Sequence, residues 1–239
     1  MKKINTILAA VSAVLMLSVT SANSIEFKAG LSANGMAAYA NATETLKGDG
    51  AGTGGQTGRI TNEEAVLATS FASAFLEISS EDVMGLGIGV SYAPEVADLE
   101  KETRTIQQAV AERNTATQDS GDQVIDGKIQ DLMSIYLTMP VSDGAYVKAG
   151  YMQATLVTSE NLATGSKYED IDMTGLQVGA GYEGSLGDMA FWRAEGTYQM
   201  WDDLSTSGSE ANASDDSTKN KITAELGSVT GTLSVGMKF

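Results

Sequence analysis

The last nine residues of the chain, 231–239, alternate strictly between apolar and polar or small side chains. One face carries the apolar Leu233, Val235, Met237 and Phe239, and the other carries Thr232, Ser234, Gly236 and Lys238. In water such a strand needs a core for its apolar face, and its free edge invites aggregation. We therefore expect this segment to close a barrel whose apolar face contacts lipid.

The amino terminus has the three parts of a secretory signal peptide. Lys2 and Lys3 form a basic start, residues 7–19 carry no charge and are mainly apolar, and residues 20–22 are small, as a cleavage site requires. The apolar stretch is about 13 residues long, shorter than the about 20 that a membrane-spanning helix needs. We expect residues 1–22 to be removed and residues 23–239 to form one domain.

Composition excludes several classes of protein. Without Lys2 and Lys3, 31 acidic residues stand against 13 basic ones, so the net charge is −18. Nucleic-acid binding needs clustered lysine and arginine, so we expect this chain not to bind nucleic acid. The chain has no cysteine, so its stability must come from strand pairing and burial without disulfides.

Eight segments of the chain alternate with the period of a β-strand. In the second segment we prefer Ala72, Ala74, Leu76 and Ile78 as the outward residues, although Phe71 and Phe75 are an alternative. The strands are expected near residues 24–40, 66–78, 84–92, 127–139, 145–157, 173–183, 190–200 and 227–239.

The connections between these segments are long and short in turn. The long ones cover 41–65, 94–126, 158–172 and 202–226, and the short ones cover 79–82, 140–144 and 184–188. This is the pattern of outer-membrane barrels, which have short periplasmic turns and long outer loops. The sequence predicts an all-β, eight-stranded antiparallel up-and-down transmembrane barrel in the outer membrane of a Gram-negative bacterium.

Outward aromatic residues fall at two heights along the expected strands. Phe27, Tyr182, Trp192 and Phe239 lie near the turns, whereas Tyr39, Tyr92 and Tyr198 lie nearer the loops. Aromatic side chains gather at both interfaces of a bilayer, so we predict two aromatic girdles.

The chain resembles the small outer-membrane barrel family of outer membrane proteins A and X. The resemblance covers residues 23–239 and depends on the alternation, on the terminal Phe239, and on residues 136–140 followed by 146–151. It implies that Phe239 belongs to the signal read by the barrel-assembly machinery. Some members carry a periplasmic domain after the barrel, and we expect none after Phe239.

Alternation places charged residues inside the barrel, where eight strands leave room only for side chains. The expected interior charges are Glu26, Lys28, Lys128, Lys148, Glu183, Arg193, Glu195 and Lys238. Isolated charges in such a space cost several kcal/mol each, so we expect a paired, hydrogen-bonded network. The network either plugs the barrel or lines a narrow, gated ion path.

The sequence offers little for catalysis. It contains no histidine, which excludes a Ser-His or Asp-His mechanism and imidazole ligation of a metal. We expect no catalytic residues, no cofactor and no metal site, and we do not expect an enzyme.

The connection 94–126 contains apolar residues spaced three and four apart. Val96, Leu99, Thr103, Ile106 and Val110 follow this spacing, which suits an amphipathic helix near 95–113. Such a helix would cover the barrel mouth or contact a partner. The alternative is a pair of strands that extend beyond the membrane.

Three functions are compatible with these features. The first is a non-catalytic structural or surface-interaction barrel; the second is a small porin-like channel for ions or very small solutes; the third is a receptor or adhesin that acts through its loops. The expected partners are outer-membrane lipid, lipopolysaccharide, the barrel-assembly machinery and an extracellular partner of the loops. The acidic loops would gather divalent cations near lipopolysaccharide or simply keep the surface soluble.

Overall fold

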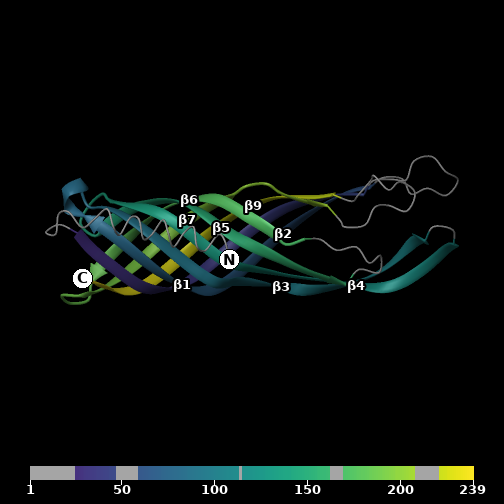
Figure 1. Cartoon of the computed structure of the whole chain (residues 1–239), viewed down its shortest axis with the longest axis horizontal. Helices are drawn as coiled ribbons and strands as arrows, with labels where there is room; N and C mark the ends of the chain where they lie inside the picture. The colour runs from purple at the N-terminus through teal and green to yellow at the C-terminus, as the bar shows by residue number, and fades with distance from the viewer. Residues whose placement is uncertain (1–24, 47–58, 113–114, 162–168, 208–220) are drawn as a thin grey trace.

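The computed structural model describes residues 25–46, 59–112, 115–161, 169–207 and 221–239. Nearly all of these residues lie in strands of one antiparallel sheet that curls into an elongated barrel (Figure 1). The strands are β1 (Ile25–Leu46), β2 (Arg59–Ser80), β3 (Leu86–Glu112), β4 (Thr115–Pro140), β5 (Ala145–Asn161), β6 (Ile171–Ser185), β7 (Ala190–Trp201), β8 (Leu204–Ser207) and β9 (Lys221–Lys238).

The sheet closes because its first and last strands pair. β1 pairs with β9 along 18 residues, and Phe27 and Phe239 exchange two further backbone hydrogen bonds of 3.1 and 2.9 Å. β8 pairs with β9 and continues the line of β7 after Asp202 and Asp203. β7 and β8 thus occupy one strand position of the wall, and we call each of the eight positions a stave. The prediction of an eight-stranded antiparallel barrel is confirmed.

The register of the ladders fixes the geometry of the cylinder. Paired residues followed once around the wall from Lys28 lead back to β1 at Ala38, ten residues farther along. Eight strands with this stagger tilt by about 40° to the barrel axis. The interior of such a cylinder is narrow, so its inward side chains pack against one another.

Tight connections join the strands at one end. β2 passes through the 3-10 turn Glu81–Val83 into Met84 and Gly85, whose φ angles of 60° and 73° are left-handed. The alternation predicted that the third strand begins at Met84, but it begins at Leu86. β4 ends at Pro140, as expected for a residue that cannot donate to the ladder.

The predicted helix near 95–113 is wrong. β3 and β4 pair with each other as far as Glu112 and Thr115, so this connection is a long hairpin that extends beyond the rest of the wall (Figure 1). The ladder shifts register between Glu95 and Ala97 and again between Leu99 and Glu102. These irregularities interrupt the two-residue alternation at residues 95–102, whereas residues 102–112 pair regularly with β4.

Among the described residues, the ladder between β2 and β3 is the shortest between neighbouring staves when β7 and β8 are counted as one. The pairing of β2 with β3 begins where Ser80 lies opposite Leu86 and ends where Ala74 lies opposite Tyr92. The described residues show no further pairs between these strands. Pro94 follows, and proline has no N–H for a ladder. Beyond this point the Thr69 hydroxyl donates to the Val96 carbonyl at 2.9 Å, so a side-chain contact takes the place of the ladder.

None of the described helical segments is long and apolar enough to cross a membrane. The expected signal peptide at residues 1–22 lies outside the described residues.

Candidate functional site

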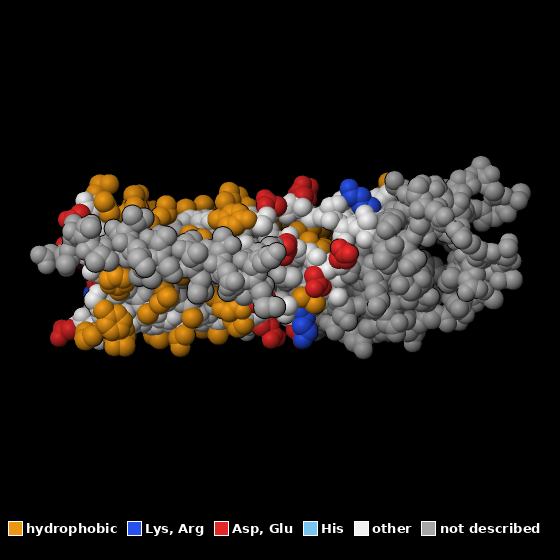
Figure 2. Space-filling model, viewed as in Figure 1, with side chains coloured by type: hydrophobic (Ala, Val, Ile, Leu, Met, Phe, Trp, Pro, Cys, Tyr) orange, Lys and Arg blue, Asp and Glu red, His pale blue; other side chains and the backbone are white. Residues whose placement is uncertain are grey.

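The outward face of the barrel is apolar over the part of the wall nearest the turns (Figure 2). Along β9, Leu233 and Val235 are exposed while Ser234 between them is buried. On β2, Leu76 is exposed and Phe75 is buried, which confirms the preferred orientation of the second strand. Acidic side chains lie at both ends of this apolar band (Figure 2). An apolar surface of this extent is not compatible with water on all sides.

The aromatic residues expected at the two interfaces all point outward and are partly exposed. They are Phe27, Tyr39, Tyr92, Tyr182, Trp192, Tyr198 and Phe239. Near the turns the rings of Tyr182 and Trp192 pack with centroids 5.8 Å apart. Nearer the loops the hydroxyl groups of Tyr39 and Tyr198 hydrogen bond at 3.1 Å. One aromatic contact thus lies near the turns and the other nearer the loops, and their position at the two interfaces of a bilayer stays a prediction.

The wall meets the two demands that lipid makes of a protein. Backbone polar groups must be paired, because the bilayer core offers no water, and the outward side chains must be apolar. A ladder joins each neighbouring pair of staves, and the band between the aromatic residues is apolar. The chain is an outer-membrane β-barrel. It resides in the outer membrane of a Gram-negative bacterium, and barrels of this kind turn their short connections toward the periplasm.

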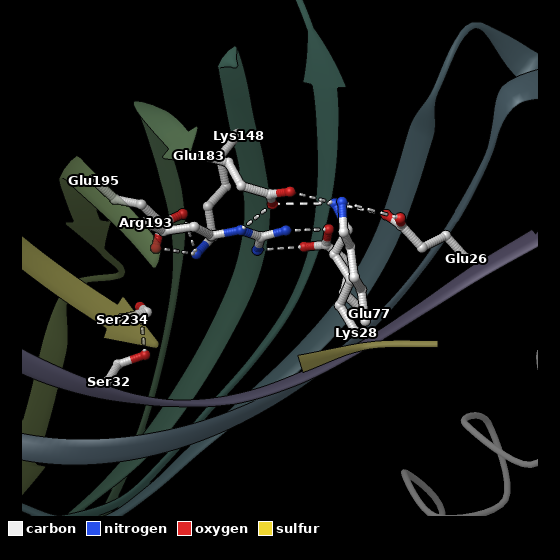
Figure 3. A network of polar contacts seen from close by, with 10 residues as sticks. Glu26, Lys28, Ser32, Glu77, Lys148, Glu183, Arg193, Glu195 and Ser234 are labelled. Atoms are coloured by element: carbon white, nitrogen blue, oxygen red, sulfur yellow. Dashed lines mark hydrogen bonds and ion pairs between the residues drawn. The ribbon is translucent and has the colours of Figure 1, made fainter. Parts of the chain in front are cut away.

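The lumen of this outer-membrane barrel contains a network of charged side chains at the turn end (Figure 3). Its centre is the pair of Glu77 on β2 and Arg193 on β7. The two terminal guanidinium nitrogens of Arg193 donate to the two carboxylate oxygens of Glu77 at 2.9 and 2.6 Å. The side chains of Arg193 and Glu77 are 4% and 2% exposed. A bidentate geometry of this kind is the strongest form of ion pair, and here it is shielded from water.

A second carboxylate links Arg193 to β1. The Nε of Arg193 donates to Glu183 on β6 at 2.8 Å, and the Nζ of Lys28 lies 3.0 Å from the same carboxylate. Lys28 is directly opposite Lys238 in the ladder between β1 and β9, where like charges repel. Glu26 offsets this repulsion, because its oxygens lie 3.1 Å from Lys28 and 3.8 Å from Lys238.

The remaining interior pair connects two strands that are separated by β6 in the wall. The Nζ of Lys148 on β5 lies 3.2 Å from a carboxylate oxygen of Glu195 on β7. The same ammonium lies 4.0 Å from the ring centroid of Tyr136. A cation over an aromatic face is stabilised where water is excluded, so Tyr136 contributes to holding Lys148 inside.

The structure changes the predicted set of interior charges at two positions. Lys128 is not an interior residue: its side chain is 46% exposed, and it pairs with Asp98 at 3.3 Å. The prediction failed because Asp131 takes a left-handed φ of 56° and the β4–β5 ladder shifts register between Gln130 and Met133. The alternation of β4 reverses at this bulge.

Glu77 is the interior charge that the sequence analysis omits, although the alternation of β2 turns it inward. With Glu77 included and Lys128 removed, the predicted three acids and five bases become four of each. The acids are Glu26, Glu77, Glu183 and Glu195, and the bases are Lys28, Lys148, Arg193 and Lys238. The interior network of the described residues is therefore neutral.

Aromatic rings fill the space around this network. The guanidinium carbon of Arg193 lies 5.3, 5.3 and 5.1 Å from the ring centroids of Phe75, Tyr146 and Phe191. Glycine on a neighbouring strand makes room for the ring of Tyr136, because a Cβ at Gly89 would overlap it. A larger residue at this inward position of β3 would displace the ring.

Hydroxyl and amide side chains occupy the next level of the lumen, which we call the hydroxyl layer. Ser32 pairs with Ser234 at 2.8 Å, and Ser91 pairs with Ser134 at 2.7 Å. Asn34, Ser73, Thr232, Gln199, Ser228 and Thr230 form further hydrogen bonds in this layer. A cavity of about 60 Å³ lies among these groups. The side-chain nitrogen of Gln177, which lines the cavity, is buried and has no protein partner.

Apolar side chains fill the lumen toward the loop end, and we call them the apolar layer. Its buried members are Met36, Ala38, Ala93, Val96, Ala97, Ile129, Ala154 and Met173. Leu67, Phe71, Leu132, Leu156, Trp201, Leu204 and Leu226 pack against them. Every stave contributes to this layer, so it occupies the full circumference of the lumen.

The described residues hold no group of three or more aspartate, glutamate, histidine or cysteine side chains placed to bind a metal ion. Asp202, which follows β7, accepts a hydrogen bond from the Thr174 hydroxyl.

Solved structures similar to this chain are outer-membrane proteins with low sequence identity. OprG from Pseudomonas aeruginosa is 14% identical, with 90% of this chain and 96% of that chain covered and a TM-score of 0.46. The protease OmpT from Escherichia coli is 11% identical, with 93% and 99% covered and a TM-score of 0.42. Ail of Yersinia pestis is 14% identical, with 86% and 98% covered and a TM-score of 0.34. No protein-family model and no curated protein matches the chain.

Proposed function

We propose that this outer-membrane barrel is non-catalytic and non-conducting, and that it acts as a structural element of the membrane that presents its loop end to the surroundings. The observation that carries this proposal is the filled lumen. A neutral ion network, a hydrogen-bonded hydroxyl layer and an apolar layer succeed one another between the turn end and the loop end. A barrel packed in this way offers stability rather than a passage.

The side chains available inside the barrel support a non-catalytic role. The sequence has no histidine or cysteine, and the most buried interior carboxylates, Glu77 and Glu195, are each paired with a cation. A general base must be free to accept a proton, and a carboxylate held by a guanidinium or an ammonium is a weak one. OmpT, one of the similar solved structures, is a protease, so incubation with peptide and lipid substrates is a necessary test. We expect no turnover.

The expected partners fit the two ends of the molecule. The apolar band contacts membrane lipid, and the exposed acidic residues at the loop side, among them Glu64, Asp172 and Asp203, face lipopolysaccharide. Carboxylates contact its phosphates favourably only through divalent cations. Phe239, which is 66% exposed beside β1, is the residue we expect the barrel-assembly machinery to recognise.

Two measurements test the proposal. In planar bilayers we expect the purified protein to be silent at all voltages, and cells that lack it should become more sensitive to detergent until the wild-type chain is restored. Regular conductance steps that change with Lys148→Ala or Arg193→Ala would instead support the small channel. The cavity beside Lys148 and Glu195 is the observation that favours that second candidate.

A receptor or adhesin role is the third candidate, and the long β3–β4 hairpin favours it because it extends beyond the rest of the wall (Figure 1). Replacement of residues 99–126 by a short turn tests this role. Loss of cell or phage attachment, with heat-modifiable migration on a gel unchanged, would assign the binding to the hairpin.

A further inference from the structure

The inward residues of the barrel change character in the same order on several strands. Along β1, Lys28 is followed by Ser32 and Asn34 and then by Met36. β6 runs in the opposite direction, and its inward residues pass from Met173 through Gln177 to Glu183. The charged network, the hydroxyl layer and the apolar layer are therefore three successive levels of the lumen.

Water is compatible with the first two levels. The cavity of about 60 Å³ is lined by Lys148, Gln177, Arg193 and Glu195 together with several hydroxyl groups. A space of this size holds one or two water molecules, and polar cavities of this kind are hydrated. Gln177 is 5% exposed, and its buried N–H₂ group lacks a protein acceptor, so it donates to such a water. Lys148, Arg193 and Glu195 line this cavity, so a water inside it also contacts charged groups.

The third level is different, because its buried members have no polar side-chain atoms. Met173 is 1% exposed, and Met36, Ile129 and Val96 surround it with further apolar groups. A narrow apolar section of a pore loses its water, and an ion that enters it gives up its hydration without compensation. The desolvation of one small ion in such a medium costs many times the thermal energy.

We propose that the apolar layer, and not the charged network, is the barrier that prevents ions from crossing this barrel. The layer acts as a dry seal at the loop end, above a hydroxyl layer whose polar cavity has room for water. The barrier to ions depends more on the lack of polar side chains in this layer than on the width of the lumen there. This inference depends on the packing of the lumen and goes beyond the proposed structural role.

The test introduces polarity into the layer at nearly constant volume. The double variant Met36→Gln/Met173→Gln keeps side chains of similar length, and Met36→Leu/Met173→Leu keeps the layer apolar. In planar bilayers with potassium chloride we expect the glutamine variant to show conductance steps where the wild type is silent. The leucine variant should behave like the wild type. Heat-modifiable migration and a β-type circular dichroism spectrum show that each variant has formed a barrel.

A third variant separates this inference from a gate made of ion pairs. Glu77→Met/Arg193→Met removes the central pair and leaves the apolar layer unchanged, so it should remain as silent as the wild type. Conduction by this variant together with silence of the folded glutamine variant would overturn the inference. If the glutamine variant does not fold, the single variant Met173→Gln gives the same comparison. A conducting wild type would contradict the proposed function alone, and the ranking of the variants would still decide where the barrier lies.

Discussion

The ion pair of Glu77 and Arg193 offers the sharpest test of how this barrel is held together. Glu77→Gln removes the negative charge and places an N–H₂ group against the guanidinium, so at least one of the two hydrogen bonds of 2.9 and 2.6 Å is lost. Arg193 keeps its bond of 2.8 Å to Glu183. Both partners are almost fully buried, so water cannot replace the missing carboxylate.

The expected cost follows from this geometry. Removal of one partner from a buried ion pair typically costs about 3–5 kcal/mol, because the other charge is left without compensation. Since Glu183 still neutralises part of the charge of Arg193, we expect the lower end, about 3 kcal/mol. The exposed pair of Lys128 and Asp98, at 3.3 Å, is the matched control. Asp98→Asn should cost less than about 1 kcal/mol, as is usual for surface pairs.

Urea unfolding in lipid vesicles, followed by the fluorescence of Trp192 and Trp201, measures both variants. Glu77→Met/Arg193→Met should be more stable than Glu77→Gln, because it removes both buried charges and leaves Glu183 paired with Lys28. An effect of Glu77→Gln as small as that of Asp98→Asn would refute the reasoning. It would mean that water reaches the pair and screens it.

Three further results are expected from other parts of the barrel. Gly89→Ala should lower the free energy of unfolding by about 1–3 kcal/mol, because its Cβ would overlap the ring of Tyr136; Gly35→Ala, with open space around its Cβ, should leave the unfolding midpoint unchanged within error. Leu233→Arg places a cation in the apolar band and should cost about 2–4 kcal/mol in the same vesicle assay, unless this part of the wall lies outside the bilayer. Deletion of Phe239 should reduce the fraction of heat-modifiable protein in cells while refolding in detergent continues; equal assembly in cells would exclude its recognition as a signal.

The sequence predicted those parts of the fold that follow a regular period. Alternation located the eight staves, the orientation of β2 and the outward aromatic residues, because a two-residue period continues as long as the ladder is regular. The prediction failed where the ladder is irregular. At Asp131 a bulge reverses the alternation, so Lys128 was assigned to the wrong side. The two register shifts in β3 interrupt the alternation at the start of the segment that was predicted to be a helix.

The site was predictable in kind but not in detail. Charged residues on inward faces predicted a network, but the predicted set contained three acids and five bases and omitted Glu77. The inward position of Glu77 in the preferred alternation of β2 was the available signal. The bidentate contact with Arg193 was not accessible, because it depends on the stagger of ten residues that brings β2 and β7 into reach across the lumen.

The interior ion pairs connect residues that lie far apart in the sequence. Glu77 and Arg193 are separated by 116 positions, and Lys28 and Glu183 by 155. A growing sheet with only its early strands in place would therefore carry unmatched charges on its concave side, which keep it hydrated and open. Neutrality is reached only when the last strands arrive in the correct register. The arrangement thus favours entry into the bilayer by the finished cylinder over insertion of a fragment or of a wrongly aligned sheet.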